Sequence, residues 1–155
     1  MTKAVKAVSP KGLASYPKIF KPNTRFNSEG VYETGLVVKA DQAAAFQEQI
    51  KQVFTDEFGN GKLTKAFMPW KENEDGDVVF TFKSSKKPMV YDSKGLPIKK
   101  ELDVGSGSEL KIGTAIYPWS AGGKVGAKLY LNSVQIIQLV EYSGSPFSAE
   151  EGGIS

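Results

Sequence analysis

The sequence contains no cysteine and no histidine, and Arg25 is its only arginine. Without cysteine, disulfide scaffolds, thiolate zinc sites and cysteine nucleophiles are excluded. Without histidine, the chain lacks the commonest general base and transition-metal ligand, which excludes Ser-His-Asp hydrolases, histidine-ligated zinc enzymes and zinc deaminases. No apolar run approaches the ~18–20 residues that cross a bilayer, and the basic start leads into Ser9 and Pro10, not into a signal core. These absences predict a cytosolic binding domain, with no membrane partner.

What is present is a globular composition with an uneven charge distribution. The 155 residues are 40% hydrophobic and 24% charged, which suits one domain with a real core. Residues 1–28 hold six basic residues and no acid, and residues 83–100 hold six lysines against Asp92. After Lys128 every charged residue is acidic. Such segregation indicates a polyanion partner and an acidic end that competes for the same groove; the alternative is that these lysines only solvate loops.

The hydrophobic pattern predicts one helix and five strands. Residues 41–58 carry an apolar stripe at helical spacing, with Asp41 as the N-cap and Gly59 as the stop. Pro17 should place the first strand at an edge or a bulge. The expected strands, the last of them bent near residues 132–133, span residues 13–20, 31–38, 78–83, 109–117 and 127–142. Five strands with one helix after the second predict a mainly β, α+β fold built on a small five-stranded barrel.

Two segments invite a catalytic interpretation, and neither supports it well. The acidic residues Glu72, Glu74, Asp75 and Asp77 do not have the spacing of an EF-hand loop, so a polar hairpin tip is the better interpretation. Residues 105–108 resemble a phosphate-binding loop, but a strand follows them where a helix would be needed. The serines have no imidazole partner. The sequence therefore predicts a protein that is not an enzyme, with no catalytic residue, metal or cofactor.

Basic and aromatic residues alternate along the chain, which is what binding of single-stranded nucleic acid requires. In the last two strands the core positions 110, 112, 129 and 131 turn their neighbours to the outer face of the barrel. Trp119, in a glycine-rich loop, is the favoured stacking platform; Phe67, Phe80 and Phe82 are taken as core, and Trp70 is left open. The candidate nucleic-acid contacts are Lys21, Arg25, Lys83, Lys111, Tyr117, Trp119, Lys124, Lys128 and Tyr130.

Three stretches in a fixed order carry a resemblance to a known family. The first is IFKP at residues 19–22 with FNSEGVY at 26–32, and the second is DVVFTFK at 77–83. The third and most specific runs from GSGSELKI at 105–112 through YPW at 117–119 to VGAKLYLNSV at 125–134. Together they resemble the single-stranded DNA-binding proteins of bacteriophage replication, in particular those of short-tailed phages. The resemblance covers most of residues 13–142.

The resemblance implies an oligonucleotide/oligosaccharide-binding barrel, or OB-fold, over residues 11–143. The residues themselves predict flexible ends, because the basic N-terminus (1–10) lacks periodicity and the C-terminal end (144–155) is polar. The resemblance also implies sequence-independent binding of single-stranded DNA in phage replication and recombination, in the cytoplasm of the infected host. Implied partners are single-stranded DNA, the phage DNA polymerase and helicase-primase, and a second copy in a homodimer. Relatives often end in an acidic tail with a terminal aromatic; residues 149–155 hold two acids and no aromatic, so the tail is truncated or this member differs.

Three other functions remain open from the residues alone. A virion or assembly protein would use the exposed aromatics for subunit contacts, and its lysines would only keep it soluble. A metal-dependent nuclease would use the acidic residues at 72–77. An RNA-binding domain of the same fold is the third, because nothing in the sequence visibly selects against a 2′-hydroxyl.

Overall fold

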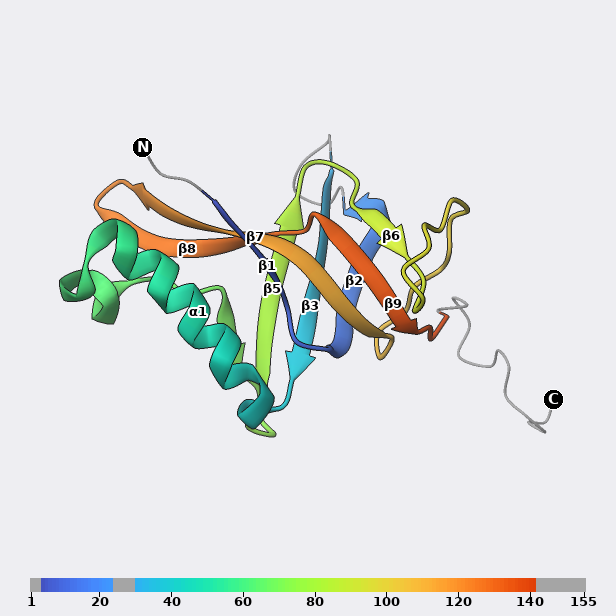
Figure 1. Cartoon of the computed structure of the whole chain (residues 1–155), viewed down its shortest axis with the longest axis horizontal. Coiled ribbons are helices and arrows are strands. Elements are labelled where there is room, and N and C mark those ends of the chain that lie inside the picture. Colours follow the sequence, from blue (N-terminus) through green and yellow to red (C-terminus); the bar gives the residue numbers. More distant parts are fainter. Residues whose placement is uncertain (1–3, 24–29, 142–155) are drawn as a thin grey trace.

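The computed structural model describes residues 4–23 and 30–141 (Figure 1). No helix in these two ranges is both long enough and apolar enough to cross a membrane. The elements, in chain order, are β1 (Val5–Val8), β2 (Gly12–Asn23), β3 (Val31–Val38), α1 (Ala40–Phe58), the short 3-10 helix η1 (Asn60–Lys65), β4 (Trp70–Glu72), β5 (Val78–Ser84), β6 (Met89–Tyr91), β7 (Glu109–Ala121), β8 (Lys124–Tyr130) and β9 (Ser133–Gln138).

Five of the strands close into a ring. The order is β2, β3, β5, β8 and β7, and β7 pairs back with β2. The β5–β8 pairing is parallel and the other pairings in the ring are antiparallel. α1 follows β3, the second strand of the ring. The mainly β barrel with one helix after its second strand is therefore confirmed.

The core fills the ring and the space beneath α1. Alternate residues of β5 and β7 point inward, and Phe80, Phe82, Leu110, Ile112 and Ile116 are fully buried. The Phe46 ring of α1 meets the Phe80 ring edge-on, with 5.0 Å between centroids. The assignment of Phe80 and Phe82 to the core is confirmed. The same assignment for Phe67 is wrong, because that residue is 54% exposed.

The ends of α1 differ in how well the sequence predicts them. The helix ends at Gly59, as expected: its φ of +85° suits a residue without a β-carbon, and its N–H donates to the Thr55 carbonyl. Asp41 is not the N-cap. Lys39 holds that position without a side-chain hydrogen bond, and its carbonyl accepts from the N–H of Gln42 and of Ala43. Asp41 instead lies in the first turn, where a carboxylate suits the helix dipole.

The irregular part of β2 at residues 15–18 packs against the turn at residues 105–108. The register of β2 against β3 shifts between Ser15 and Lys18, which confirms the bulge expected at Pro17. Tyr16 takes a positive φ of 48° within this bulge, and its N–H donates to Ser106 Oγ at 2.9 Å. The 105–108 segment is a turn that leads into β7, as predicted.

The acidic segment between β4 and β5 is also a turn. Asn73 Oδ1 accepts hydrogen bonds from the N–H groups of Asp75 and Asp77, at 3.0 Å each. The predicted polar hairpin tip is therefore confirmed. In the part of the chain that the structure describes, no three acidic side chains are grouped so that they could hold a metal ion.

Two features of the strands differ from the sequence-based expectation. The bend expected near residues 132–133 is present at Leu131 and Asn132, but it divides the expected strand in two: β8 stays in the ring, whereas β9 pairs with β7 and β6 outside it. Residues Val5–Val8, in a segment expected to be flexible, form β1 against β7. Isolated sequence pattern cannot reveal either pairing, since both depend on the free edges of the long strand β7. Residues 144–155 lie outside the described ranges.

Candidate nucleic-acid interface

Tyr117, Lys128 and Tyr130 form a compact cluster on the outer face of β7 and β8. Tyr117 and Lys128 are direct cross-strand partners. The Lys128 ammonium lies 5.0 Å from the centroid of the Tyr117 ring and 5.2 Å from that of Tyr130, and the two rings are 5.9 Å apart. The buried neighbours Ile116 and Leu129 turn these side chains outward, as the alternation predicts. One cation therefore lies against two partly exposed aromatic rings.

A row of charged residues continues from this cluster across the barrel. Lys83 on β5 is the parallel partner of Tyr130. Its ammonium lies 3.9 Å from Glu33 Oε1 on β3, and Glu33 in turn faces Lys18 on β2. The Lys83 side chain is 62% exposed and that of Glu33 25%. Glu33 thus pairs with Lys83 and lies cross-strand from Lys18, beside the basic and aromatic cluster on β7 and β8.

At the other end of the cluster, three side chains meet near the β7–β8 hairpin. The rings of Phe67 and Trp119 are nearly parallel, with an interplanar angle of 19° and centroids 6.2 Å apart. The Lys124 ammonium lies 5.8 Å from the Phe67 centroid. Trp119 belongs to β7 and not to a loop, because this strand continues to Ala121 before Gly122 and Gly123, both at positive φ, turn the chain.

Gly126 makes this arrangement possible. A β-carbon there would contact the Phe67 carbonyl oxygen and would lie 2.8 Å from Cζ2 of the Trp119 indole. The bare backbone lets the indole lie against β8. Phe67 is fixed beside it by two backbone hydrogen bonds, in which its N–H donates to the Val125 carbonyl and its carbonyl accepts from the Ala127 N–H.

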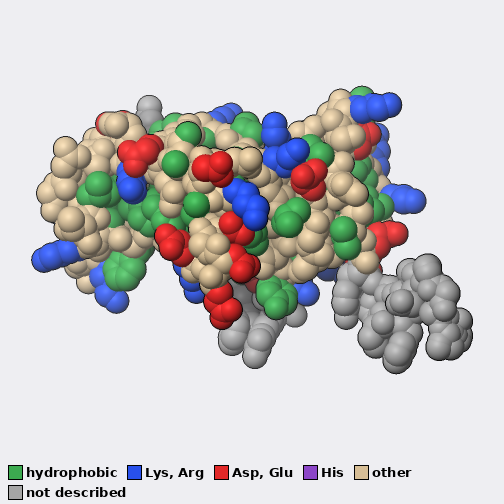
Figure 2. Space-filling model, turned by 90° about the horizontal axis from the view of Figure 1, so that it is seen from below, with side chains coloured by type: hydrophobic (Ala, Val, Ile, Leu, Met, Phe, Trp, Pro, Cys, Tyr) green, Lys and Arg blue, Asp and Glu red, His purple; other side chains and the backbone are tan. Residues whose placement is uncertain are grey.

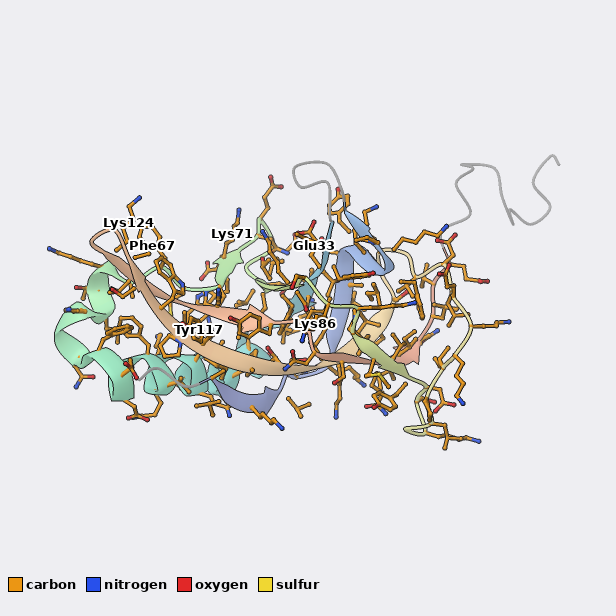
Figure 3. The ribbon with its side chains drawn as sticks, turned by 90° about the horizontal axis from the view of Figure 1, so that it is seen from above. Glu33, Phe67, Lys71, Lys86, Tyr117 and Lys124 are labelled. Carbon is orange, nitrogen blue, oxygen red and sulfur yellow. The ribbon has the colours of Figure 1, made fainter. Side chains whose placement is uncertain are left out.

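The residues described above, from Phe67 and Lys124 at the hairpin to Lys83 and Glu33 across the barrel, form what we call the aromatic–lysine strip. Lys124, Phe67, Lys71 and Glu33 follow one another along the side of the molecule away from α1 (Figure 3). By contrast, the face seen in Figure 2 shows acidic and basic side chains interspersed. Exposed ammonium groups beside aromatic faces are suited to neutralising phosphates and stacking bases. The members of the strip are Phe67, Trp119, Lys124, Tyr117, Lys128, Tyr130, Lys83 and Glu33.

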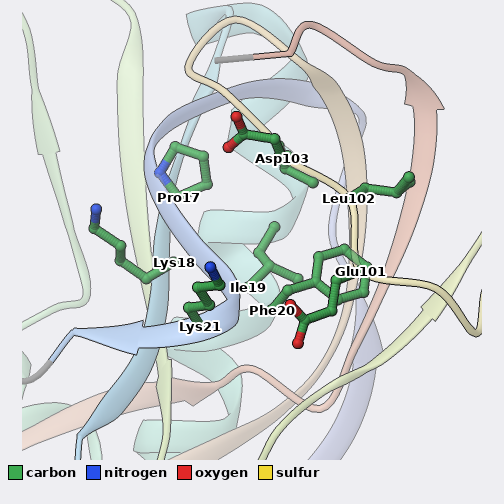
Figure 4. A pocket seen from close by; sticks show the side chains of 9 residues that line it. Pro17, Lys18, Ile19, Phe20, Lys21, Glu101, Leu102 and Asp103 are labelled. Carbon is green, nitrogen blue, oxygen red and sulfur yellow. The ribbon is translucent and has the colours of Figure 1, made fainter. Parts of the chain in front are cut away.

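The remaining candidate contacts lie elsewhere. Lys21 lines a pocket of about 410 Å³ between β2 and the 101–104 loop, with Glu101 and Asp103 on the opposite wall (Figure 4). Lys111 lies in a shallow hollow beside Tyr91 and Gln135, where β7 pairs with β9. Lys111 and Tyr117 are an even number of residues apart on β7 and so share a face, but they lie apart because β7 pairs with β9 at Lys111 and with β8 at Tyr117. Arg25 lies outside the described residues.

Sequence reasoning missed two members of the strip. Phe67 follows η1 in a segment without strand periodicity, so local pattern does not show that its side chain is exposed. Glu33 is not among the candidate contacts, which are all basic or aromatic. Its outward position was nevertheless readable, since it alternates with the buried Thr34 and Leu36. Trp70, which was left open, packs edge-on against Phe80 at 5.9 Å and is partly buried.

Comparisons with known proteins agree on one family. The family model described as the single-stranded DNA-binding protein of bacteriophage T7 matches residues 59–139, which is more than half of the chain. The single-stranded DNA-binding protein of Enterobacteria phage T3 is 29% identical over 76% of this chain and 66% of its own length. That of Escherichia phage T7 is 34% identical over 50% of this chain and 40% of its own length. The matched region thus spans less than two thirds of either relative.

Solved structures show the same fold. The crystal structure of the single-stranded DNA-binding protein encoded by bacteriophage T7 superposes with a TM-score of 0.77 at 23% identity, covering 97% of this chain and 98% of that one. The single-stranded DNA-binding protein of bacteriophage Enc34, in complex with single-stranded DNA, gives a TM-score of 0.68 at 17% identity. That match covers 90% of this chain and 89% of the other. The predicted OB-fold is therefore confirmed.

Proposed function

Because the chain belongs to the family of the bacteriophage T7 single-stranded DNA-binding protein, we propose that it binds single-stranded DNA without sequence preference. The observation that carries the proposal is the Tyr117–Lys128–Tyr130 cluster, in which one ammonium lies against two aromatic rings. Phosphate contacts and base stacking are both independent of base identity. The family is one of binding proteins, which agrees with the prediction that the chain is not an enzyme.

The proposed mechanism makes and breaks no covalent bond. Lys83, Lys124 and Lys128 neutralise phosphates and release counterions from the strand, so affinity falls with rising salt. The aromatic rings of the strip stack on bases, each stacked base contributing roughly 1–3 kcal/mol. A duplex hides its bases in the stack, so it offers the rings nothing comparable. Lys21, Arg25 and Lys111 are proposed as further phosphate contacts outside the strip.

The biological setting is also a proposal. The phage sources of the relatives support a role in phage DNA replication and recombination, in the cytoplasm of the infected bacterium. The partners that fit this role are the phage DNA polymerase and helicase-primase, together with a second copy of the chain in a homodimer. Residues 11–143 are proposed as the DNA-binding domain.

Fluorescence anisotropy of a labelled oligo-dT about 30 nucleotides long tests the binding proposal. We expect binding at low salt that weakens as salt rises, with a slope of about −0.7 in log affinity against log salt for each phosphate contacted. Unlabelled duplex should compete poorly, and an oligo-rU competitor measures the preference for DNA over RNA. Absence of binding at low salt, or equal competition by duplex, would contradict the proposal.

Replacing Glu33 by glutamine should tighten DNA binding by about two- to fivefold, because its carboxylate holds Lys83 and repels phosphate. Anisotropy titrations against oligo-dT at low salt measure the change, and it should shrink at high salt as screening increases. Glu48→Gln on α1 is the matched control, since Glu48 also pairs with a lysine, Lys51, at 3.3 Å. Equal affinities of the two variants would show that Glu33 does not oppose binding.

A further inference from the structure

We propose that Phe67 is the residue on which a base stacks at the hairpin end of the strip, with Trp119 holding its ring in place and Lys124 contacting the neighbouring phosphate. This inference rests on the proposed function and assigns one contact within it. It also changes the role of Trp119, which the sequence favoured as the platform itself. Three properties of the Phe67 ring lead to this proposal: it is exposed, it is supported by Trp119 and by hydrogen bonds of its backbone to β8, and the Lys124 ammonium lies beside it.

Phe67 is a large apolar residue that lies exposed on the surface. It is 54% exposed, although the barrel beside it buries Phe80 and Phe82 completely. Leaving part of so large an apolar ring in water gives up the favourable free energy of its burial. An exposed ring in a strip of lysines is well placed to recover that free energy when a base covers it.

The ring is also held rigidly, which lowers the entropy lost on binding. Two hydrogen bonds to β8 fix the Phe67 backbone, one through its N–H and one through its carbonyl. The Trp119 indole supports the ring from β7, at 6.2 Å and nearly parallel. Trp119 itself is less available, because it is only partly exposed and lies against the backbone of Gly126.

Lys124 supplies the charge that the phosphate next to a stacked base requires. Its ammonium lies 5.8 Å from the Phe67 centroid and its side chain is exposed. From Phe67, the bound DNA can continue toward the Tyr117 cluster, because Trp119 and Tyr117 are two residues apart on β7, or about 7 Å. The Phe67 ring and the Tyr117 cluster are thus neighbouring contact points for a single DNA strand.

The test compares Phe67→Ala with Phe67→Trp, with Leu96→Ala as the control at an exposed apolar residue outside the strip. Affinity for oligo-dT is measured by anisotropy and folding by thermal melting. We expect Phe67→Ala to melt as the wild type does and to bind roughly tenfold more weakly, with an unchanged salt slope, because no charge is lost. Phe67→Trp should bind like the wild type, and its added indole emission should be quenched by DNA through stacking.

The outcomes separate this inference from the proposed function. Wild-type binding with Phe67→Ala equal to Leu96→Ala would overturn the assignment of Phe67 and leave the proposed function standing. A Phe67→Trp protein whose additional emission is insensitive to oligo-dT would overturn it as well. If the wild type itself fails to bind at low salt, the proposed function falls and this inference falls with it.

Discussion

Reversing the charge of Lys128 should weaken single-stranded DNA binding more than any other single change in the strip. In Lys128→Glu, a carboxylate replaces the ammonium that lies 5.0 and 5.2 Å from two aromatic rings. The change removes a phosphate contact, adds repulsion of the same phosphate, and places negative charge against the electron-rich ring faces. We expect a loss of about 2–3 kcal/mol, which is roughly 30- to 150-fold in affinity.

The salt dependence distinguishes this effect from a general change in net charge. Without the Lys128 contact, the slope of log affinity against log salt should become less steep by at least about 0.7. Lys51→Glu changes the net charge equally but acts on α1, which lies on the side of the molecule opposite Lys124 and Phe67 (Figure 3). If the two variants lose affinity to the same extent, DNA binding depends on overall charge and the strip is not its site.

The largest effect on stability is expected from truncating Phe80. This side chain is fully buried and meets Phe46 of α1 at 5.0 Å and Trp70 of β4 at 5.9 Å. Phe80→Ala removes the phenyl group that packs the helix against the barrel and leaves a cavity. Because the barrel is closed, its strands cannot move inward to fill that cavity. The free energy of unfolding should fall by about 3–5 kcal/mol, measured by urea denaturation.

A neighbouring residue on the same strand provides the control for Phe80. Thr81 is exposed on the outer face of β5, and its N–H bonds to the Pro69 carbonyl through the backbone alone, so Thr81→Ala should cost less than about 1 kcal/mol. At low temperature, folded Phe80→Ala should still bind DNA, since the ring points away from the strip. A loss of stability as small as that of Thr81→Ala would mean that the core does not depend on the Phe46–Phe80 contact.

Local sequence pattern was sufficient to predict an element and its outward side chains wherever one side of that element faces the core. The stripe from Phe46 to Phe58 predicts the body and the end of α1, whose N-cap lies two residues before the expected Asp41, and alternation on β7 and β8 turns Tyr117, Lys128 and Tyr130 outward. Both follow from fixed periods, 3.6 residues for a helix and 2 for a strand, combined with burial of apolar groups. The turn at residues 105–108 and the stop at Gly59 were likewise readable, because glycine marks them.

Two differences between the expected contacts and the aromatic–lysine strip depend on tertiary structure. Lys111 and Tyr117 share a parity on β7, yet one lies beside β9 and the other beside β8, because the strand changes partners along its length. Phe67 joins the strip only because its segment pairs with β8 at Gly126, a residue almost 60 positions away.

By itself, then, the sequence determined which alternate positions of the strands are buried, where the helix runs and which chemistry is excluded, since each depends on residue type and local spacing. Tertiary structure decided how the strip is put together and added Phe67 and Glu33 to it, because the strip is assembled from β3, β5, β7, β8 and the segment before β4. Pairing of distant segments depends on the closure of the whole barrel, and no local pattern encodes it.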